Sequence, residues 1–338
     1  MPFNVVSQGG KLAWIVVLAL VVHGNSLAQG PIEWRFYSYF APGDKAVQTN
    51  KAFAEDVFKA TGGRLKISVF AGGEMPYKAP DVVKAIATKQ IEMGDVFVGF
   101  TAGDTPELNV LQLPFLCTSY AQFDKALPVV QPVIDETLQK RFGITVAMHW
   151  TMPPQNLWLN RPVSKLEDIR GFKVRVSNPE QAEMIKTLNG SALSITSAEV
   201  VPALERKIID GAITSALSVN DWRAYELVKT GYMVNMTMGH QIMLINTEEL
   251  NKLPADVKST LLTKAREWTP KYAQMSQEGD TAARQNLLAN KVTLVEPTPA
   301  DIEKARAMMR PMWDQWAQKN GATGRRLVDG TMKACGAT

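Results

Sequence analysis

Short strands and amphipathic helices alternate along most of this 338-residue chain, and that alternation constrains the fold more than any other feature. Apolar and polar residues alternate at 32–39 and again at 65–69, as they do in half-buried strands. Helical spacing of apolar residues indicates a helix at 45–60, Asp81 begins a second helix, and 96–98 is a short apolar strand. This order of strand, helix, strand, helix and strand predicts right-handed crossovers and a parallel sheet.

The pattern returns in the second half of the chain. Further strands are expected at 174–176, 193–195 and 211–215, and helices at 179–188, 198–207 and 221–229. Residues 144–148 and 244–246 are expected to be strands that connect the two halves. After Pro254 the sequence is helical, with helices expected at 255–267 and 271–289, separated by Pro270, and at 299–319.

These elements predict an α/β fold of two lobes joined by hinge strands, with long C-terminal helices. The first lobe is expected at 29–150 and the second at 151–245, while 246–338 returns to the first lobe and then packs as helices on both lobes. Ligands of open α/β sheets bind beyond the carboxyl ends of the strands, so a cleft between the lobes is the expected site.

The N-terminus has the pattern of an export signal. Lys11 is the only charged residue among the first 28, residues 12–22 form an eleven-residue apolar run, and Ser26-Leu27-Ala28 places small residues before a cleavage site. The pattern predicts a secretory signal peptide, residues 1–28, cleaved after Ala28. A transmembrane anchor is the alternative, but eleven residues are too few to span about 30 Å of hydrocarbon. The mature protein is expected to be soluble and exported.

The remaining composition argues against several classes of protein. Without residues 1–28 the net charge falls from +4 to +3, which is too mild for a nucleic-acid-binding surface. Cys117 and Cys335 could pair in an oxidising compartment or remain two separate thiols, because the sequence does not show whether they are close. Only His149 and His240 follow the predicted cleavage site, and no closely spaced pair of cysteines exists, so no metal site is expected.

Arg175 is the strongest candidate for binding chemistry. It lies in the segment GFKVRV (171–176), which has the pattern of a turn followed by a short apolar strand. An arginine buried in such a strand needs a partner, and its planar guanidinium pairs best with a carboxylate through two parallel hydrogen bonds. The alternative is a structural arginine that pairs with an Asp or Glu of the chain itself.

Several motifs accompany this arginine in a set order: GGE at 72–74, KQIEMGD at 89–95, LPFL at 113–116, LEDIRG at 166–171 and EVVPALERKIIDG at 199–211. Together with the signal peptide, this order resembles the periplasmic solute-binding proteins of TRAP transporters over nearly the whole mature chain. The resemblance implies a periplasmic binding protein-like clamp that closes on an organic acid and delivers it to a membrane permease. It implies a mostly monomeric protein with no catalytic activity and no cofactor, in which Arg175 clamps the carboxylate.

The same resemblance implies further site residues. Gln155 stands where many members of the family carry a second arginine, as it does in members that bind 2-oxo monocarboxylates, and an amide suits a neutral keto or hydroxyl oxygen. Thr214 matches a position of polar ligand contact, and Ser215 follows it at the same strand end. The 2-oxo-acid members hold a metal ion with an acidic residue and a tryptophan after the Asp-Gly pair, where this chain has AITS (212–215), so the sequence leaves open whether a cation accompanies the ligand.

Aromatic side chains at the expected strand ends would suit an apolar or aromatic part of the ligand. The candidates are Tyr39, Phe40, Phe97 and Trp150, with Tyr77 and Trp222 as further ones. Glu74, in the GGE segment, and His240 are polar candidates for the cleft. Any of these side chains could instead belong to the core or to the surface.

The sequence thus predicts a periplasmic receptor for a 2-oxo or 2-hydroxy monocarboxylate or an aromatic acid. A receptor for C4-dicarboxylates is one alternative, and the missing second arginine weakens it. An exported enzyme acting on organic acids is another, although the motifs HExxH, GxSxG and SxxK are absent from the sequence. A binding protein of an ABC or tripartite tricarboxylate transporter is a third.

Overall fold

The computed structural model describes residues 1–4 and 30–337 of the chain. The predicted signal peptide, residues 1–28, falls mostly on positions 5–29, which lie outside the described residues. Among the helices that are described, none combines the length and the apolar character needed to cross a membrane.

Within the described residues, nine strands form one sheet in the order β2-β1-β3-β8-β4-β7-β5-β6, with β9 paired to β8. The strands are β1 Ile32–Tyr37, β2 Leu65–Phe70, β3 Met93–Phe97, β4 Ile144–Leu159, β5 Lys173–Val176, β6 Ser191–Ser194, β7 Gly211–Thr214, β8 Thr230–Asn246 and β9 Thr293–Val295. The first three belong to one lobe and β5, β6 and β7 belong to the other, so the predicted two-lobe α/β fold is confirmed.

The long strands β4 and β8 connect the lobes, and they change the character of the sheet. β4 leads from the first lobe into the second, where it pairs with β7, and β8 leads back to pair with β3. Because the two strands carry the chain in opposite directions, the pairs β4–β8, β3–β8 and β4–β7 are antiparallel. The parallel pairing predicted for the first lobe is confirmed, and the strands of the second lobe also pair in parallel, whereas the sheet as a whole is mixed.

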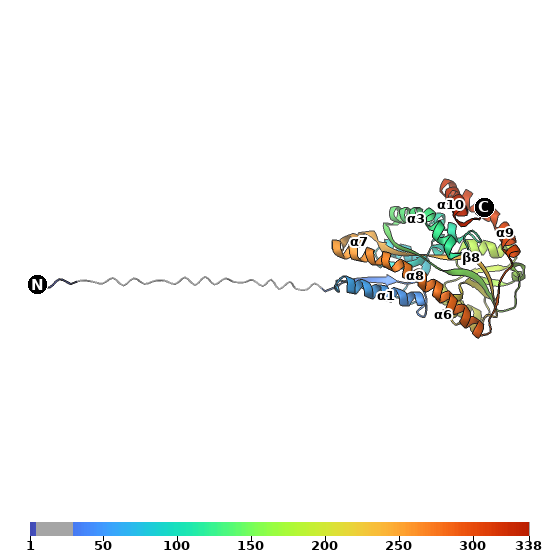
Figure 1. Cartoon of the computed structure of the whole chain (residues 1–338), viewed down its shortest axis with the longest axis horizontal. Helices are drawn as coiled ribbons and strands as arrows, with labels where there is room; N and C mark the ends of the chain where they lie inside the picture. Colours follow the sequence, from blue (N-terminus) through green and yellow to red (C-terminus); the bar gives the residue numbers. More distant parts are fainter. Residues whose placement is uncertain (5–29, 338) are drawn as a thin grey trace. The chain divides into compact units, whose positions relative to one another are not determined.

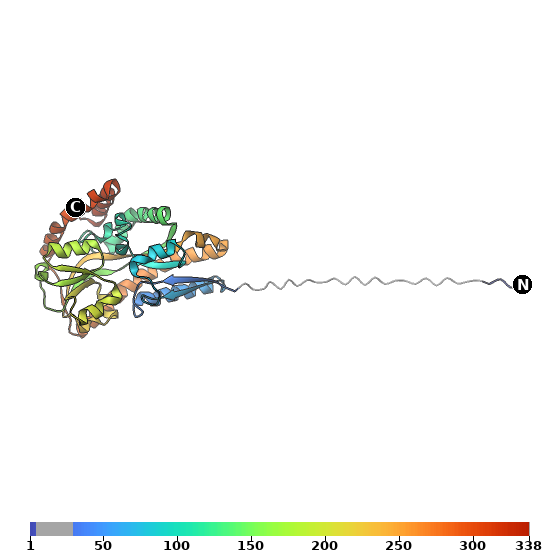
Figure 2. The ribbon, with the colours of Figure 1, turned by 180° about the vertical axis from the view of Figure 1, so that it is seen from behind.

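Helices cover both faces of this sheet. They are α1 Lys45–Ala60, α2 Val82–Ala87, α3 Tyr120–Phe142, α4 Pro179–Thr187, α5 Ser197–Glu205, α6 Ala216–Asp221, α7 Thr247–Lys252, α8 Ala255–Ala289, α9 Pro299–Lys319 and α10 Gly321–Cys335. Short 3-10 turns lie at Ala79–Asp81, Val98–Thr101, Pro106–Leu108, Val110–Gln112, Leu166–Ile169 and Ala224–Glu226. Helix α8 runs beside α1 and reaches α6, whereas α3 and α10 pack together on the other side of β8 (Figures 1 and 2).

The observed helices differ from the predicted ones in two places. The expected break at Pro270 is absent, because α8 continues through it while residues on both sides are held against α1: Trp268 Nε1 donates to Asp56 at 2.7 Å, and the Tyr272 hydroxyl donates to Asn50 at 2.6 Å. Tertiary packing thus outweighs the helix-breaking tendency of proline.

The predicted helix at 221–229 is also wrong. Ser215 Oγ accepts a hydrogen bond from the Ser218 backbone N–H and starts α6 early, at Ala216. The helix ends at Asp221, and Arg223 adopts a left-handed conformation with φ of 55°. The Asp221 and Trp222 side chains therefore lie at the end of a helix rather than at its start.

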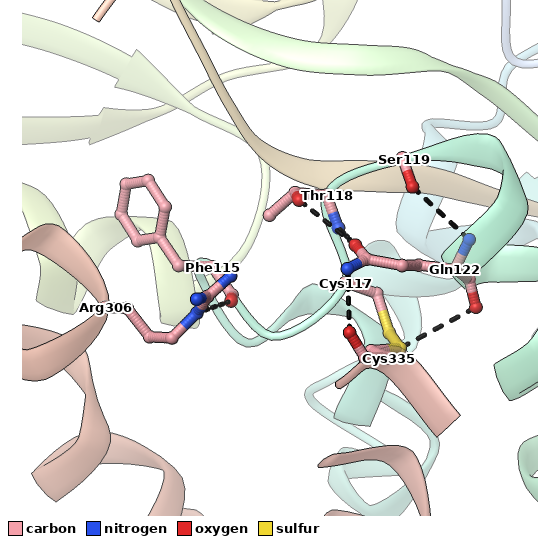
Figure 3. Close-up of a disulfide and its surroundings, with 7 residues drawn as sticks. All are labelled: Phe115, Cys117, Thr118, Ser119, Gln122, Arg306 and Cys335. Carbon is pink, nitrogen blue, oxygen red and sulfur yellow. Dashed lines mark hydrogen bonds between the residues drawn. A yellow bond between two sulfur atoms is a disulfide. The ribbon is translucent and has the colours of Figure 1, made fainter. Parts of the chain in front are cut away.

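A disulfide between Cys117 and Cys335 ties the C-terminal helix α10 to the segment before α3, with the two Cα atoms 5.5 Å apart (Figure 3). Gln122 of α3 supports this junction, because its Nε2 donates to the Cys335 carbonyl at 2.7 Å while its Oε1 accepts from the Thr118 backbone N–H at 2.8 Å. The pairing that the sequence left open is thus made, and it suits an oxidising compartment.

Candidate ligand-binding site

A cavity lies where β4 and β8 pass between the lobes, beyond the carboxyl ends of β1, β3, β5 and β7. The residues that line it come from both lobes and from both connecting strands: Tyr39, Phe40, Phe97, Phe100, Met152, Gln155, Arg175, Ser177, Ser197, Thr214, Ser218, Trp222, Gly239 and Gln241. They surround about 410 Å³ of space, which includes space open to solvent.

Arg175, on β5, contributes a fixed and buried positive charge to this cavity. Only 4% of the residue is exposed. Its Nε donates to the carbonyl oxygen of Ile195 at 2.9 Å, and its Nη1 donates to that of Ile213 at 3.1 Å, so the guanidinium plane is held from two sides. Burial lowers the pKa of Arg175 to about 10, and the group is therefore still charged at neutral pH.

This charge has no acidic side chain in direct contact in the described part of the chain, although the Glu199 carboxylate, beyond salt-bridge distance, helps to raise the pKa of Arg175. Arg175 forms no salt bridge there, whereas the exposed arginines Arg35, Arg141 and Arg223 each pair with a glutamate. A buried cation without a partner is costly, and an incoming carboxylate would supply the missing charge. The alternative of a structural arginine in a direct salt bridge with an acidic side chain is not observed among the described residues, since Glu199 acts on Arg175 only from beyond salt-bridge distance.

Three serines and one threonine line the cavity together with Arg175. Ser177 and Ser218 already have side-chain partners, Gln181 and Ser215 respectively, each at 3.0 Å. Ser197 Oγ, at the first residue of α5, is buried and has no hydrogen-bond partner among the described residues. Thr214, the last residue of β7, accepts from Trp158 Nε1 at its backbone carbonyl at 2.9 Å, and its side-chain hydroxyl forms no hydrogen bond with another described residue. Both free hydroxyls suit the oxygen atoms of an acid.

Aromatic rings form the wall that faces Arg175 from the first lobe. Tyr39 stacks on Phe40 with ring centres 4.2 Å apart, and Phe100 meets Tyr39 and Phe97 edge to face, each at 5.3 Å. Such a wall favours a flat or apolar ligand body. Among the lining residues that the structure describes, Arg175 alone is charged.

Six of the residues predicted from the sequence meet in this lining: Arg175, Gln155, Thr214, Tyr39, Phe40 and Phe97. Trp222, one of the further aromatic candidates, also lines it, and it donates from Nε1 to Asp44 at 2.9 Å. Tyr77 lies elsewhere, packed edge to face against Tyr37.

The other four predicted residues have structural partners instead. Ser215 caps α6, and Glu74 accepts a hydrogen bond from the Ala71 backbone N–H at 2.7 Å within a turn. Trp150 is 2% exposed and packs behind the cavity wall, against Phe40 and Tyr272.

His240 faces away from the cavity. Its Nε2 bonds to Nδ1 of His149 at 3.0 Å, and His149 in turn bonds to Asp135 on α3 at 2.8 Å. Burial holds the pKa of His240 well below its usual range, so this histidine is neutral. His240 and Gln241 are neighbours on β8, and successive side chains of a strand point to opposite faces. The prediction therefore chose the residue next to the one that lines the cavity.

Several lining residues were not predicted from the sequence: Phe100, Met152, Ser177, Ser197, Ser218, Gly239 and Gln241. Ser177 directly follows β5, and Ser197 is the first residue of α5. The rule that ligands bind beyond the carboxyl ends of strands could have indicated both positions. To predict Gln241, one would have needed to know that β8 pairs with both β3 and β4. In that pairing Gln241 stands opposite Phe97 on β3 and Trp150 on β4.

Comparisons with known proteins agree with this geometry. A family model described as bacterial extracellular solute-binding protein, family 7, matches residues 36–320. A solute-binding protein of Albidiferax ferrireducens is 24% identical over 294 residues, covering 85% of this chain and 86% of that protein.

Two solved structures share the fold. One is a marine metagenome TRAP solute binding protein specific for pyroglutamate, with 25% identity and a TM-score of 0.84 over 90% of this chain and 100% of that one. The other is DctP7, an extracytoplasmic solute receptor of Bordetella pertussis that binds pyroglutamic acid, with 23% identity and a TM-score of 0.84 over 89% of this chain and 99% of that one. This chain therefore belongs to bacterial extracellular solute-binding protein family 7, and the resemblance to TRAP-transporter receptors is confirmed.

Proposed function

We propose that this protein is the periplasmic receptor of a TRAP transporter and that it captures a small organic acid with one carboxylate. The observation that carries the proposal is the buried guanidinium of Arg175, which forms no salt bridge among the described residues and opens onto a cavity with no other charged lining residue. A carboxylate placed there makes a desolvated, charge-assisted pair, stronger than the same pair in water.

The uncharged part of the cavity lining suits a flat or partly apolar acid that carries one polar group besides its carboxylate. Gln155, Gln241 and two hydroxyls offer hydrogen bonds, and Tyr39, Phe40 and Phe100 offer aromatic surface. A 2-oxo or 2-hydroxy monocarboxylate or an aromatic acid fits this set. Pyroglutamate, which the two structurally similar receptors bind, fits it as well, because it combines one carboxylate with a five-membered lactam ring.

A C4-dicarboxylate is the second candidate ligand. It would need a second cation, and the lining residues of the described chain include no lysine, histidine or further arginine. Burial of its second carboxylate without a partner would be unfavourable. The other candidate, an exported enzyme, has lost support, because family 7 consists of transport receptors.

Capture is proposed to work by closure of the two lobes. The lobes would correspond to 29–150 and 151–245, with 246–338 packed on both, and the protein would act as an exported monomer cleaved after Ala28. Because Arg175 and Thr214 belong to one lobe and Tyr39 and Phe97 to the other, a ligand that touches both sides favours the closed state. The closed receptor would then deliver the acid to the membrane permease.

A thermal-shift screen tests this function. The panel contains L-pyroglutamate, 2-oxo and 2-hydroxy monocarboxylates, aromatic acids, D-glucuronate, and the dicarboxylates succinate, malate and fumarate. We expect the largest rise in melting temperature with a monocarboxylate of the first three groups, because a ligand that binds only the folded state stabilises it. Native mass spectrometry of the freshly purified protein would identify a retained ligand.

The screen can contradict the proposal in two ways. A dominant response to a dicarboxylate would show that the cavity accommodates a second negative charge. A dominant response to D-glucuronate would show that it prefers a polyhydroxylated acid to a flat one.

A further inference from the structure

Two glutamines face the cavity, one from each connecting strand. Gln155 lies on β4 and Gln241 on β8, and they are 8% and 2% exposed. Gln155 Nε2 donates to the carbonyl oxygen of Pro153 at 2.9 Å, and Gln241 Nε2 donates to that of Gly239 at 3.3 Å. Because a carbonyl oxygen can only accept, these contacts determine which end of each amide is the nitrogen.

The neighbours of Gln241 reinforce its orientation. Since its nitrogen faces Gly239, its Oε1 faces the Tyr39 hydroxyl, which donates to it at 2.9 Å. The absence of a side chain at Gly239 lets the other amide approach, because a Cβ there would lie 3.3 Å from Gln155 Nε2 and 2.9 Å from the Cβ of Met152. The two amides are therefore held on either side of one glycine.

Part of the hydrogen-bonding capacity of this pair is unused. Each amide nitrogen carries two hydrogens, and one of them is committed to the backbone in each case. Gln155 Oε1 has no hydrogen-bond partner among the described residues, whereas Gln241 Oε1 is occupied by Tyr39. The pair thus presents to a ligand two N–H donors and one strong acceptor.

From this arrangement, and resting on the proposed function, we infer that Gln155 and Gln241 select acids that carry both a hydrogen-bond donor and an acceptor beside the carboxylate. A lactam supplies an N–H for Gln155 Oε1 and a carbonyl for the amide N–H groups, and a 2-hydroxy acid does so with one hydroxyl. The inference therefore narrows the range of acids proposed above, because a 2-oxo acid supplies acceptors only and a simple ring acid supplies neither. Those ligands leave buried amide groups unpaired, which a site built for hydrogen bonding penalises strongly.

Titration calorimetry with two acids of nearly equal shape tests this selection: L-pyroglutamate, and cyclopentanecarboxylate, which has the ring without the amide. Pyruvate, which has acceptors only, serves as the third ligand. The wild-type protein should bind pyroglutamate at least about tenfold more tightly than either of the others. In Gln155→Met and Gln241→Met this ratio should fall toward one, mainly through weaker binding of pyroglutamate.

Two further variants keep the test decisive. Tyr39→Phe leaves both glutamines in place and frees the Gln241 amide, so it should lower the same ratio without deleting a cavity amide. Gln274→Met makes the matched exchange at an exposed position of α8 and should leave the ratio unchanged. Melting temperatures of the unliganded variants show whether each one is folded.

The possible failures separate the two claims. If all three acids bind equally well to the wild type and each binding is lost in Arg175→Ala, the selection is refuted and the carboxylate receptor stands. If the glutamine variants keep the wild-type ratio, the selection is likewise refuted. If no organic acid of any kind binds, the proposed function is contradicted and the inference falls with it.

Discussion

The indole Nε1 of Trp222 donates a hydrogen bond to Asp44 Oδ1 at 2.9 Å, and so joins the end of α6 to the loop before α1. A second bond beside it links the same segments, because the Lys45 backbone N–H donates to Asp221 Oδ2 at 3.0 Å. Trp222 also lines the cavity. The two lobes are therefore tied together at the edge of the candidate site.

This tie predicts a role for Trp222 in closure. Trp222→Phe keeps an aromatic ring and removes the indole N–H that donates to Asp44. The free energy that favours the closed state over an open one should therefore fall by about 1–3 kcal/mol. We expect weaker ligand binding, on the order of tenfold, and a larger radius of gyration in solution scattering without ligand. Saturating ligand should make the wild-type protein more compact and change its tryptophan fluorescence.

Trp268→Phe is the matched control, since Trp268 donates to Asp56 at 2.7 Å in a similar indole–carboxylate bond away from the cavity lining. It should lower stability and leave affinity nearly unchanged. Equal losses of affinity in both variants, or scattering curves that superimpose with and without ligand, would count against closure through Trp222.

Asp95 predicts a dependence of stability on pH. It is fully buried on β3 and accepts hydrogen bonds from the Ser38 hydroxyl, the Asn50 amide and the Tyr39 backbone N–H. Burial raises the pKa of Asp95 to about 7 despite these bonds. Because the pKa in the folded state exceeds that of the unfolded chain, about 3.8, this group stabilises the fold fully below pH 4 and loses that contribution as the pH rises to 7.

Urea unfolding of the wild type and of Asp95→Asn between pH 4 and 8 measures this effect. Asp44 and Glu180 also have pKa values raised to about 7 by burial, so the difference between the two proteins removes the contribution of Glu180 and leaves that of Asp95 together with its effect on Asp44. The free energy of unfolding of the wild type should fall relative to that of the variant as the pH rises from 4 to 7. Parallel curves would mean that Asp95 is ionised in the folded protein throughout this range.

The disulfide predicts sensitivity to reductants. Cys117 and Cys335 are 218 residues apart, and a cross-link over such a long loop restricts the unfolded chain strongly. Reduction should lower the free energy of unfolding by about 2–5 kcal/mol, measured by thermal or urea denaturation with and without dithiothreitol. The double variant Cys117→Ala, Cys335→Ala should resemble the reduced wild type and should not respond to the reductant. An equal response of both proteins would assign the effect to another cause.

Local patterns in the sequence predicted much of this architecture. Periodicity predicts most strands and helices of the two lobes and the bounds of α1 and α9, and it misses α3 and α10. The burial of Arg175 follows from its place in an apolar strand. The errors concern features that depend on distant parts of the chain. Pro270 was expected to break a helix, and contacts with α1 on both sides of it keep α8 continuous.

In the candidate site, too, local patterns predicted some residues, and the errors depend on distant parts of the chain. Tyr39, Phe97 and Thr214 follow from the rule that ligands bind at strand ends, because that rule needs only the position of each strand. Gln241 and His240 could not be told apart, since the face that each one takes depends on how β8 pairs with β3 and β4. Extending the predicted strand at 244–246 back through Gly239 would have placed Gln241 and Gly239 on one face and His240 on the other.

The central claim is that Arg175 supplies the charge that holds the ligand carboxylate. Its truncation removes two hydrogen bonds to the backbone and also an unpaired buried charge, so these opposing effects should leave the melting temperature of the unliganded protein nearly unchanged. The ligand, in contrast, loses its charged partner, and truncation of one member of such a desolvated pair costs about 2–5 kcal/mol.

Titration calorimetry with the best acid of the thermal-shift screen and with its neutral carboxamide tests this claim most directly. The account predicts that the wild-type protein binds the acid at least about tenfold more tightly than the carboxamide, and that Arg175→Ala binds both equally weakly. Binding of the acid by Arg175→Ala with wild-type affinity would contradict it and would remove Arg175 from the site.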